Sequence, residues 1–120
     1  MGSIFDRYGG FAVIRKVVSE FYDRVLDSPQ LSSHFAGVDM RSLINHQTQF
    51  IAYLTGGPGA VYTDDALRRV HAPLGITEPE VEEMRRLLRE TLEDLDFDPA
   101  DIKTIDGEME VRTKLIVGAS

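Results

Sequence analysis

Three histidines are the residues of this sequence best suited to bind a metal: His34, His46 and His71. They lie in separate segments and lack the spacing of four positions that places two imidazoles on one helix face. His71 is the most firmly bounded, because Pro73 ends its segment and Gly75 allows a sharp turn. A single imidazole presented in this way can serve as one metal ligand, although a lone histidine is more often structural.

One firm imidazole suits a haem, which supplies four nitrogen ligands and needs one axial ligand and an apolar slot from the protein. Side chains able to line such a slot are spread along the chain: Phe21, Phe35, Leu43, Phe50, Leu54, Val70 and Ile76. An ordinary hydrophobic core carries similar apolar stripes. Periodicity alone therefore favours a plain core over a cofactor site.

Gln47 is a polar residue within the apolar stripe of the segment 40–54. Two interpretations stay open at this point. The amide lies at the margin of the stripe, or it points into a pocket, where a buried amide needs a hydrogen-bonding partner.

The elements that must position these residues are helices. Apolar residues recur at helical spacing, and Gly or Pro separates the segments. The expected helices cover 4–8, 11–26, 40–54, 78–95, and a last helix that starts at Asp98-Pro99 and includes Leu115 and Ile116; a short turn covers 30–35. Asp64 or Thr63 is expected to cap the short helix that ends near His71, and Thr77 and Glu80 form a capping box. This pattern predicts one all-α domain over residues 1–120.

Composition excludes several classes of function. A net charge of −7 argues against a nucleic-acid or anionic-membrane partner, and the chain has no cysteine for disulfides, thiolate metal sites or nucleophiles. No apolar run approaches the ~20 residues that span a bilayer. Motifs of serine hydrolases, phosphate loops and zinc proteases are missing from the sequence. We therefore expect a cytoplasmic protein with no nucleic-acid or membrane partner.

The ordered motifs of the chain resemble those of the truncated haemoglobins, the two-over-two globins, and within them group I. The matching motifs are Tyr8-Gly9-Gly10, Phe21-Tyr22-Asp23-Arg24-Val25-Leu26, Phe35 with Val38-Asp39-Met40, His46-Gln47 with Phe50, Gly56-Gly57-Pro58 with Tyr62-Thr63, and Val70-His71 with Gly75-Ile76-Thr77. Their order and spacing make the resemblance specific, and together they extend from about residue 3 to the last helix. The resemblance implies a two-over-two helical sandwich around haem b, iron protoporphyrin IX.

The resemblance also implies roles for individual residues. His71 would be the proximal iron ligand, bound through Nε2, while its Nδ1 donates to a nearby backbone carbonyl. Tyr22 and Gln47 match the distal pair that stabilises bound O2 and would take part in catalysis. Leu43, an apolar residue one turn before Gln47, leaves that stabilisation to the pair. Phe35 would pack on the haem plane.

Other residues receive less defined roles from the resemblance. His46 would either bind the iron from the distal side or lie at the haem edge, and both alternatives stay open. The remaining haem contacts would be Phe50, Leu54, Tyr62, Val70 and Ile76, and candidates for propionate contacts are Arg68, Arg69, Tyr53 and Tyr62. His34 is expected at the surface.

The function that the resemblance implies is reversible binding of O2, with NO and CO as further diatomic ligands. Nitric oxide dioxygenation is an expected activity, and it needs an external reductase because the chain has no flavin or nicotinamide fingerprint. The protein is expected to be a monomer. The alternatives are a gas sensor or store without turnover, and a haem-free helical interaction protein.

Overall fold

The computed structural model describes residues 2–58, 64–71 and 75–117. The elements in these ranges are α1 (Ile4–Tyr8), α2 (Phe11–Asp27), the 3-10 helix η1 (Ser32–Phe35), α3 (Met40–Leu54), α4 (Asp64–His71), α5 (Glu78–Asp94), α6 (Pro99–Val111) and α7 (Thr113–Ile116). No strand occurs in this part of the chain. The predicted all-α class is therefore confirmed, and the long helices begin and end within one residue of the expected positions, except at the end of the last helix.

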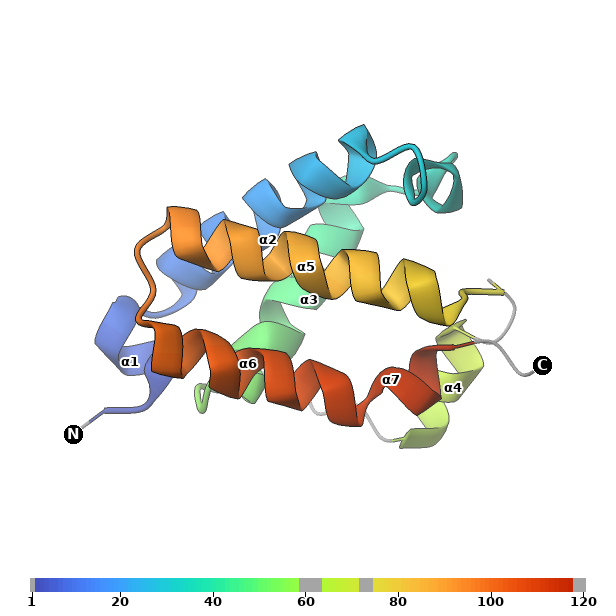
Figure 1. Ribbon diagram of the computed structural model, residues 1–120. Coiled ribbons are helices and arrows are strands. Elements are labelled where there is room, and N and C mark those ends of the chain that lie inside the picture. Colours follow the sequence, from blue (N-terminus) through green and yellow to red (C-terminus); the bar gives the residue numbers. More distant parts are fainter. Residues whose placement is uncertain (1, 59–63, 72–74, 118–120) are drawn as a thin grey trace.

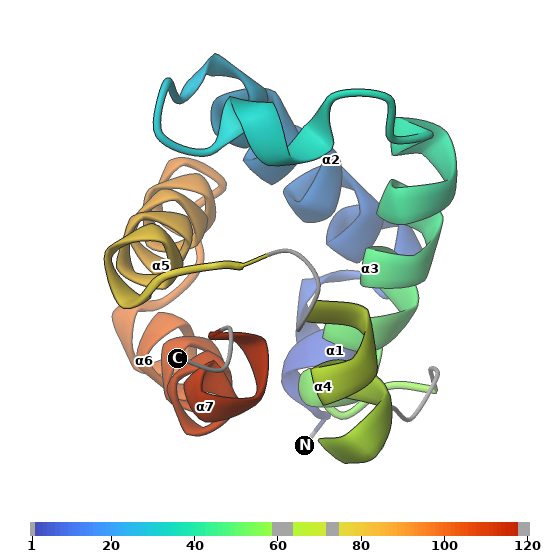
Figure 2. The same ribbon diagram turned by 90° about the vertical axis from the view of Figure 1, so that its right-hand side faces the viewer.

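Two helix pairs build the fold. α2 packs against α3, α5 packs against α6, and α2 also contacts α5, so that one pair lies over the other (Figure 1). The two short helices α4 and α7 lie side by side at one end of the sandwich (Figure 2). None of the helices in the described ranges is long and apolar enough to cross a bilayer.

The helix starts follow from side chains that accept free backbone N–H groups. The Ser3 hydroxyl accepts from the Asp6 amide at 3.1 Å, and Asp39 caps α3 in the same way. The predicted capping box is present at α5, where the Thr77 amide donates to the Glu80 carboxylate at 2.9 Å. These local contacts explain why the predicted starts of α1, α3 and α5 hold in the folded chain.

One expectation about helix boundaries is tested only in part, and another differs from the structure. Asp64 is the first residue of α4 and not its cap, while Thr63 lies outside the described residues. The expected single last helix is divided at Arg112 into α6 and α7. The break changes the direction of the chain, and it allows α7 to pack against α4.

The core lies mainly between α2 and the α5–α6 pair. Its most deeply buried apolar side chains are Ile14, Val17, Val18, Val25, Leu31, Leu92 and Ile105. Thr91 is also fully buried, and its hydroxyl donates to the Leu87 carbonyl at 2.8 Å and accepts from Arg24 at 2.8 Å. The buried hydroxyl of Thr91 is thus paired, as burial requires.

A polar cluster fixes α1 to α6. The Arg7 guanidinium binds both carboxylate oxygens of Asp101, at 2.7 and 2.9 Å, and the Tyr8 hydroxyl donates to the same carboxylate at 2.6 Å. The Tyr8 ring stacks on Phe97 with a centroid distance of 3.9 Å. Asp101 therefore fixes α1 to the first turn of α6.

Candidate functional site

A cavity of about 270 Å³ opens between the helix pairs. Most of its wall is apolar, with Phe21, Phe35, Leu43, Phe50 and Ile76 among the lining side chains. Large mostly apolar cavities that contain a few polar groups are the usual form of cofactor and ligand sites. The polar side chains that line this cavity therefore decide what it can bind.

His71 is the last residue of α4 and lines the cavity. Its Nδ1 lies 2.8 Å from the backbone carbonyl oxygen of Leu67. A carbonyl can only accept, so Nδ1 carries the proton in the neutral ring. Nε2 then keeps its lone pair, which is the state that a metal ligand requires.

Tyr22 comes from α2 and lines the same cavity. It is only 5% exposed, and its ring meets those of Phe21 and Phe35 edge-on, at centroid distances of 4.9 and 5.7 Å. Its hydroxyl has no hydrogen-bond partner within the described ranges. Burial raises the pKa of the Tyr22 hydroxyl, so the group stays protonated at neutral pH and can donate to a ligand.

α3 contributes Leu43, His46 and Gln47 to the cavity wall. Leu43 and Gln47 are half-buried, whereas His46 is exposed. Gln47 thus borders the cavity from the apolar stripe of α3. His46 borders the cavity from its solvent side.

The chemistry of these residues fits a haem. Among the described residues, the wall offers the His71 imidazole, whose Nε2 makes no hydrogen bond, apolar side chains for a flat macrocycle, and the Tyr22 hydroxyl, which has no hydrogen-bond partner. A haem needs one protein ligand and an apolar slot, and a diatomic ligand bound to it supplies the missing acceptor. The donor set is therefore that of a haem pocket.

Comparison with protein families decides the classification. The sequence model of the Bacterial-like globin family matches residues 3–116. The chain belongs to the bacterial-like globins. Membership in a globin family implies haem binding and binding of diatomic gases, in agreement with the composition of the cavity wall.

Individual relatives place this globin among the truncated haemoglobins. It is similar to the group 1 truncated hemoglobin of Nostoc commune, with 30% identity over 92 residues, 77% of each chain. It is also similar to the group 1 truncated hemoglobin of Mycolicibacterium paratuberculosis, with 44% identity over 75 residues, 62% of this chain and 54% of that protein. The alignment thus spans only about half the length of the second relative.

Solved structures confirm the two-over-two fold of this globin. The truncated hemoglobin from Tetrahymena pyriformis superposes with a TM-score of 0.89 at 24% identity, covering 98% of this chain and 100% of that one. The 2/2 hemoglobin from Synechococcus sp. PCC 7002, solved with covalently attached heme, gives a TM-score of 0.83 at 26% identity, covering 96% and 98%. At these identities the likeness is first of all one of fold.

His34 differs from its predicted position at the surface. It is half-buried in η1 and lines the cavity, and its Nε2 lies 2.5 Å from the Glu80 carboxylate on α5. Glu80 lines the cavity too. Sequence reasoning missed this pair because its members are 46 positions apart, and no periodicity relates η1 to α5.

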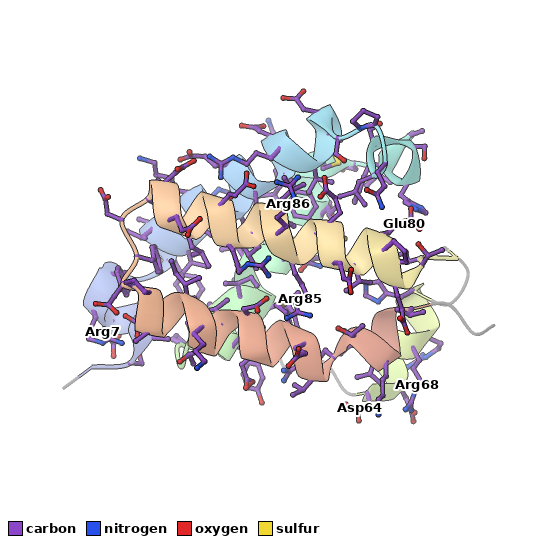
Figure 3. All side chains as sticks on the ribbon, in the orientation of Figure 1. Arg7, Asp64, Arg68, Glu80, Arg85 and Arg86 are labelled. Carbon is purple, nitrogen blue, oxygen red and sulfur yellow. The ribbon has the colours of Figure 1, made fainter. Side chains whose placement is uncertain are left out.

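The cationic side chains of the cavity wall also differ from those expected. Arg85 and Arg112 line the cavity, whereas Arg68 and Arg69 are exposed on α4 and do not line it. Figure 3 shows Arg85 between α5 and α6, and Arg68 at the outer end of α4. Arg85 binds Asp106 at 2.9 Å, and the Arg112 guanidinium lies 5.8 Å from the Phe50 ring centre.

The remaining predicted haem contacts fall in three places. Phe35, Phe50 and Ile76 line the cavity. Leu54 is half-buried near the end of α3 and packs against the core without lining the cavity, and Tyr53 is exposed beside it. Tyr62 and the side chain of Val70 lie outside the part of the chain that the structure describes.

Proposed function

We propose that this protein holds haem b on His71 and binds O2 reversibly on the Tyr22 side of the cavity. The observation that carries the proposal is that both residues line one apolar cavity and that, among the described residues, neither the His71 Nε2 nor the Tyr22 hydroxyl has a hydrogen-bond partner. Each group lacks the partner that the cofactor or its ligand would provide. NO and CO, which have a similar size, are expected to enter the same space.

When bound, haem would supply the iron that a diatomic ligand needs and the electrons shared with it. The protein residues do the rest. Leu67 orients the imidazole of His71 through Nδ1, and the apolar wall keeps water away from the ligand. The Tyr22 hydroxyl donates a hydrogen bond to the ligand, and Gln47 offers a second polar group at the cavity.

An absorption spectrum of the purified protein tests the proposal. Haem bound through His71 predicts a Soret band that shifts on reduction and again on addition of CO. His71→Gly should lose most of its haem, and added imidazole should restore binding because it replaces the missing ligand. Arg69→Ala is the matched control on the same helix, since this side chain is exposed and should leave haem binding unchanged.

A wild-type protein without a Soret band after haem addition would contradict this proposal. It would favour instead a haem-free helical protein that retains the globin scaffold.

Nitric oxide dioxygenation is the activity that we propose beyond gas binding. O2 held by Tyr22 and Gln47 would react with incoming NO. Both oxygen atoms would join the nitrogen to give nitrate, and a ferrous haem would supply the one electron required and become ferric. Turnover requires an external reductase to return the haem to its ferrous state. Addition of NO to the oxygenated protein should produce one nitrate per haem, and repeated cycles should appear only with an electron donor. Absence of nitrate would favour a sensor or store.

A further inference from the structure

The pair of His34 and Glu80 lies where η1 and α5 meet at the cavity wall. Figure 3 shows Glu80 at the start of α5, beside the segment that leads from α2 to α3. The two side chains are only 22% and 15% exposed. A charged hydrogen bond in such a place is screened less by water than one at the surface.

Glu80 divides its carboxylate between two partners. Oε2 binds His34, while Oε1 accepts from the amide and the hydroxyl of Thr77, at 2.9 and 3.0 Å. Backbone and side-chain donors, the Thr77 amide first and then His34, hold the pKa of Glu80 below its usual range. The carboxylate is therefore ionised at neutral pH and keeps both partners.

His34 and Thr77, the two partners of Glu80, are each next in sequence to a side chain of the cavity wall. His34 precedes Phe35, whose ring packs edge-on against Tyr22, the proposed hydrogen-bond donor to the ligand. Thr77 follows Ile76, a buried side chain of the cavity wall in the segment after α4. Glu80 thus lies next to two parts of the cavity wall, Phe35 through His34 and Ile76 through Thr77.

We propose that His34 is a positioning residue that fixes η1 to α5 through Glu80 and so sets the place of Phe35 beside Tyr22. The inference rests on the proposed function for its effect on O2, but its structural part holds for the haem-free protein as well. Nε2 of His34 must carry a proton, because the carboxylate only accepts. A side chain with a donor at the same place should therefore replace it.

Amide hydrogen exchange of the haem-free protein tests the structural part. In His34→Ala, the amides of His34 in η1 and of Val38 just after it, which donate to Leu31 and Phe35 at 3.1 Å, should exchange about two- to tenfold faster because one hydrogen bond is lost. His34→Gln should restore the wild-type rate, since its amide nitrogen lies near the position of Nε2. Ser33→Ala is the matched control, because this side chain is exposed on the same helix.

Glu80→Gln is a second variant that keeps an acceptor for Thr77 and removes the charge that binds His34. It should show the same faster exchange in η1, even where His34→Ala fails to fold. Unchanged exchange in both variants, or an alanine effect that glutamine does not reverse, would overturn the proposal.

The haem-loaded protein tests the link to the ligand. His34→Ala should release O2 about two- to tenfold faster, and His34→Gln should release it at the wild-type rate. Arg7→Ala removes a hydrogen-bonded pair far from the cavity and should not change O2 release. A wild-type protein that binds no haem would end the proposed function and leave the exchange result to decide the role of His34. Faster exchange with unchanged O2 release would overturn the link.

Discussion

Tyr8 and Tyr22 carry the same hydroxyl in different surroundings. The Tyr8 hydroxyl donates to Asp101 and accepts from the Asp98 amide at 2.9 Å, so its hydrogen-bonding capacity is used. The Tyr22 hydroxyl has no partner in the described residues and faces an apolar cavity. Burial raises the pKa of both hydroxyls, but only Tyr22 is left with a donor to offer a ligand.

Tyr22→Phe should therefore speed O2 release from the haem-loaded protein. A hydrogen bond to a ligand that carries negative charge contributes about 1.5–3 kcal/mol, which corresponds to roughly a tenfold to hundredfold change in rate. Stopped-flow measurement of O2 dissociation checks this value. Tyr8→Phe is the control and should leave the rate unchanged, and equal rates in wild type and Tyr22→Phe would show that Tyr22 does not touch the ligand.

His46 differs from His71 in having no fixed hydrogen bond among the described contacts and in being exposed at the cavity edge. We propose two alternatives for its ring, which would either bind the haem iron in competition with O2 or lie at the haem edge. If His46 binds the iron, the ferric protein should be low-spin at neutral pH, and His46→Leu should be high-spin, as read from the visible spectrum. A high-spin wild type would place His46 at the haem edge.

Among the helices and loops, two glycines differ in the space available for a side chain. A Cβ at Gly57 would lie 2.3 Å from Cγ of Phe5, a buried ring that covers the loop after α3. A Cβ at Gly107, inside α6, would meet no atom within 4 Å. The first glycine is needed for close packing, whereas the second only weakens its helix.

Gly57→Ala should lower the free energy of unfolding by about 1–3 kcal/mol, because the Phe5 ring must move. Gly107→Ala should raise it by about 0.5–1 kcal/mol, because alanine favours the helix. Urea unfolding of the two variants and the wild type gives both values. A loss of stability in both would show that the α6 position is more constrained than its surroundings indicate.

Sequence patterns predicted the helices well because each one carries its own signals. Asp39, Thr77 and Asp98 cap α3, α5 and α6 at the helix starts that were expected, and the apolar stripes of α2, α3 and α5 face the core. The break at Arg112 could not be predicted in this way, because no glycine or proline lies next to it in the sequence. It depends on the packing of α7 against α4, a contact between distant segments that local patterns do not encode.

The candidate site shows the same difference between contacts within one segment, which sequence patterns predict, and contacts between distant segments, which they do not. His71 and its bond to Leu67 lie within one helical turn, so a segment bounded by Pro73 was enough to expect a fixed imidazole. The pair of His34 and Glu80 could not be expected, because it arises only when η1 and α5 meet. Leu54 is the opposite case. Its place on the apolar stripe of α3 follows from the sequence, but the side chain packs against the core and does not line the cavity.

For the molecule as a whole, charge pairing predicts the response to acid. Donors hold the pKa of four carboxyls below the ordinary range: Asp101 through Arg7, Asp106 through Arg85, Glu83 through Arg86, and Glu80 first through the Thr77 amide. A carboxyl with a lowered pKa stabilises the fold above its unfolded-state pKa, and that contribution is lost as the pH falls through the folded-state value. The protein should therefore lose stability in acid.

Asp101→Asn tests the contribution of one of these groups. The variant should be less stable than wild type above about pH 4, and the difference should narrow as the pH falls below 3.8, the ordinary value for this carboxyl. Urea unfolding at several pH values measures the difference. Asp23→Asn is the control, because Asp23 is exposed and takes part in no ion pair within the described residues. A difference that stays constant with pH would contradict this linkage.

The contact between α4 and α7 has a consequence for synthesis of the protein. The helix that carries His71 leaves the ribosome well before α7, which packs against it. A nascent chain that ends within α6 thus contains every residue proposed to bind the ligand, yet lacks the helix that packs against α4. We therefore expect tight haem binding only after α7 has been synthesised, and chains that end within α6 should release haem faster than the full chain.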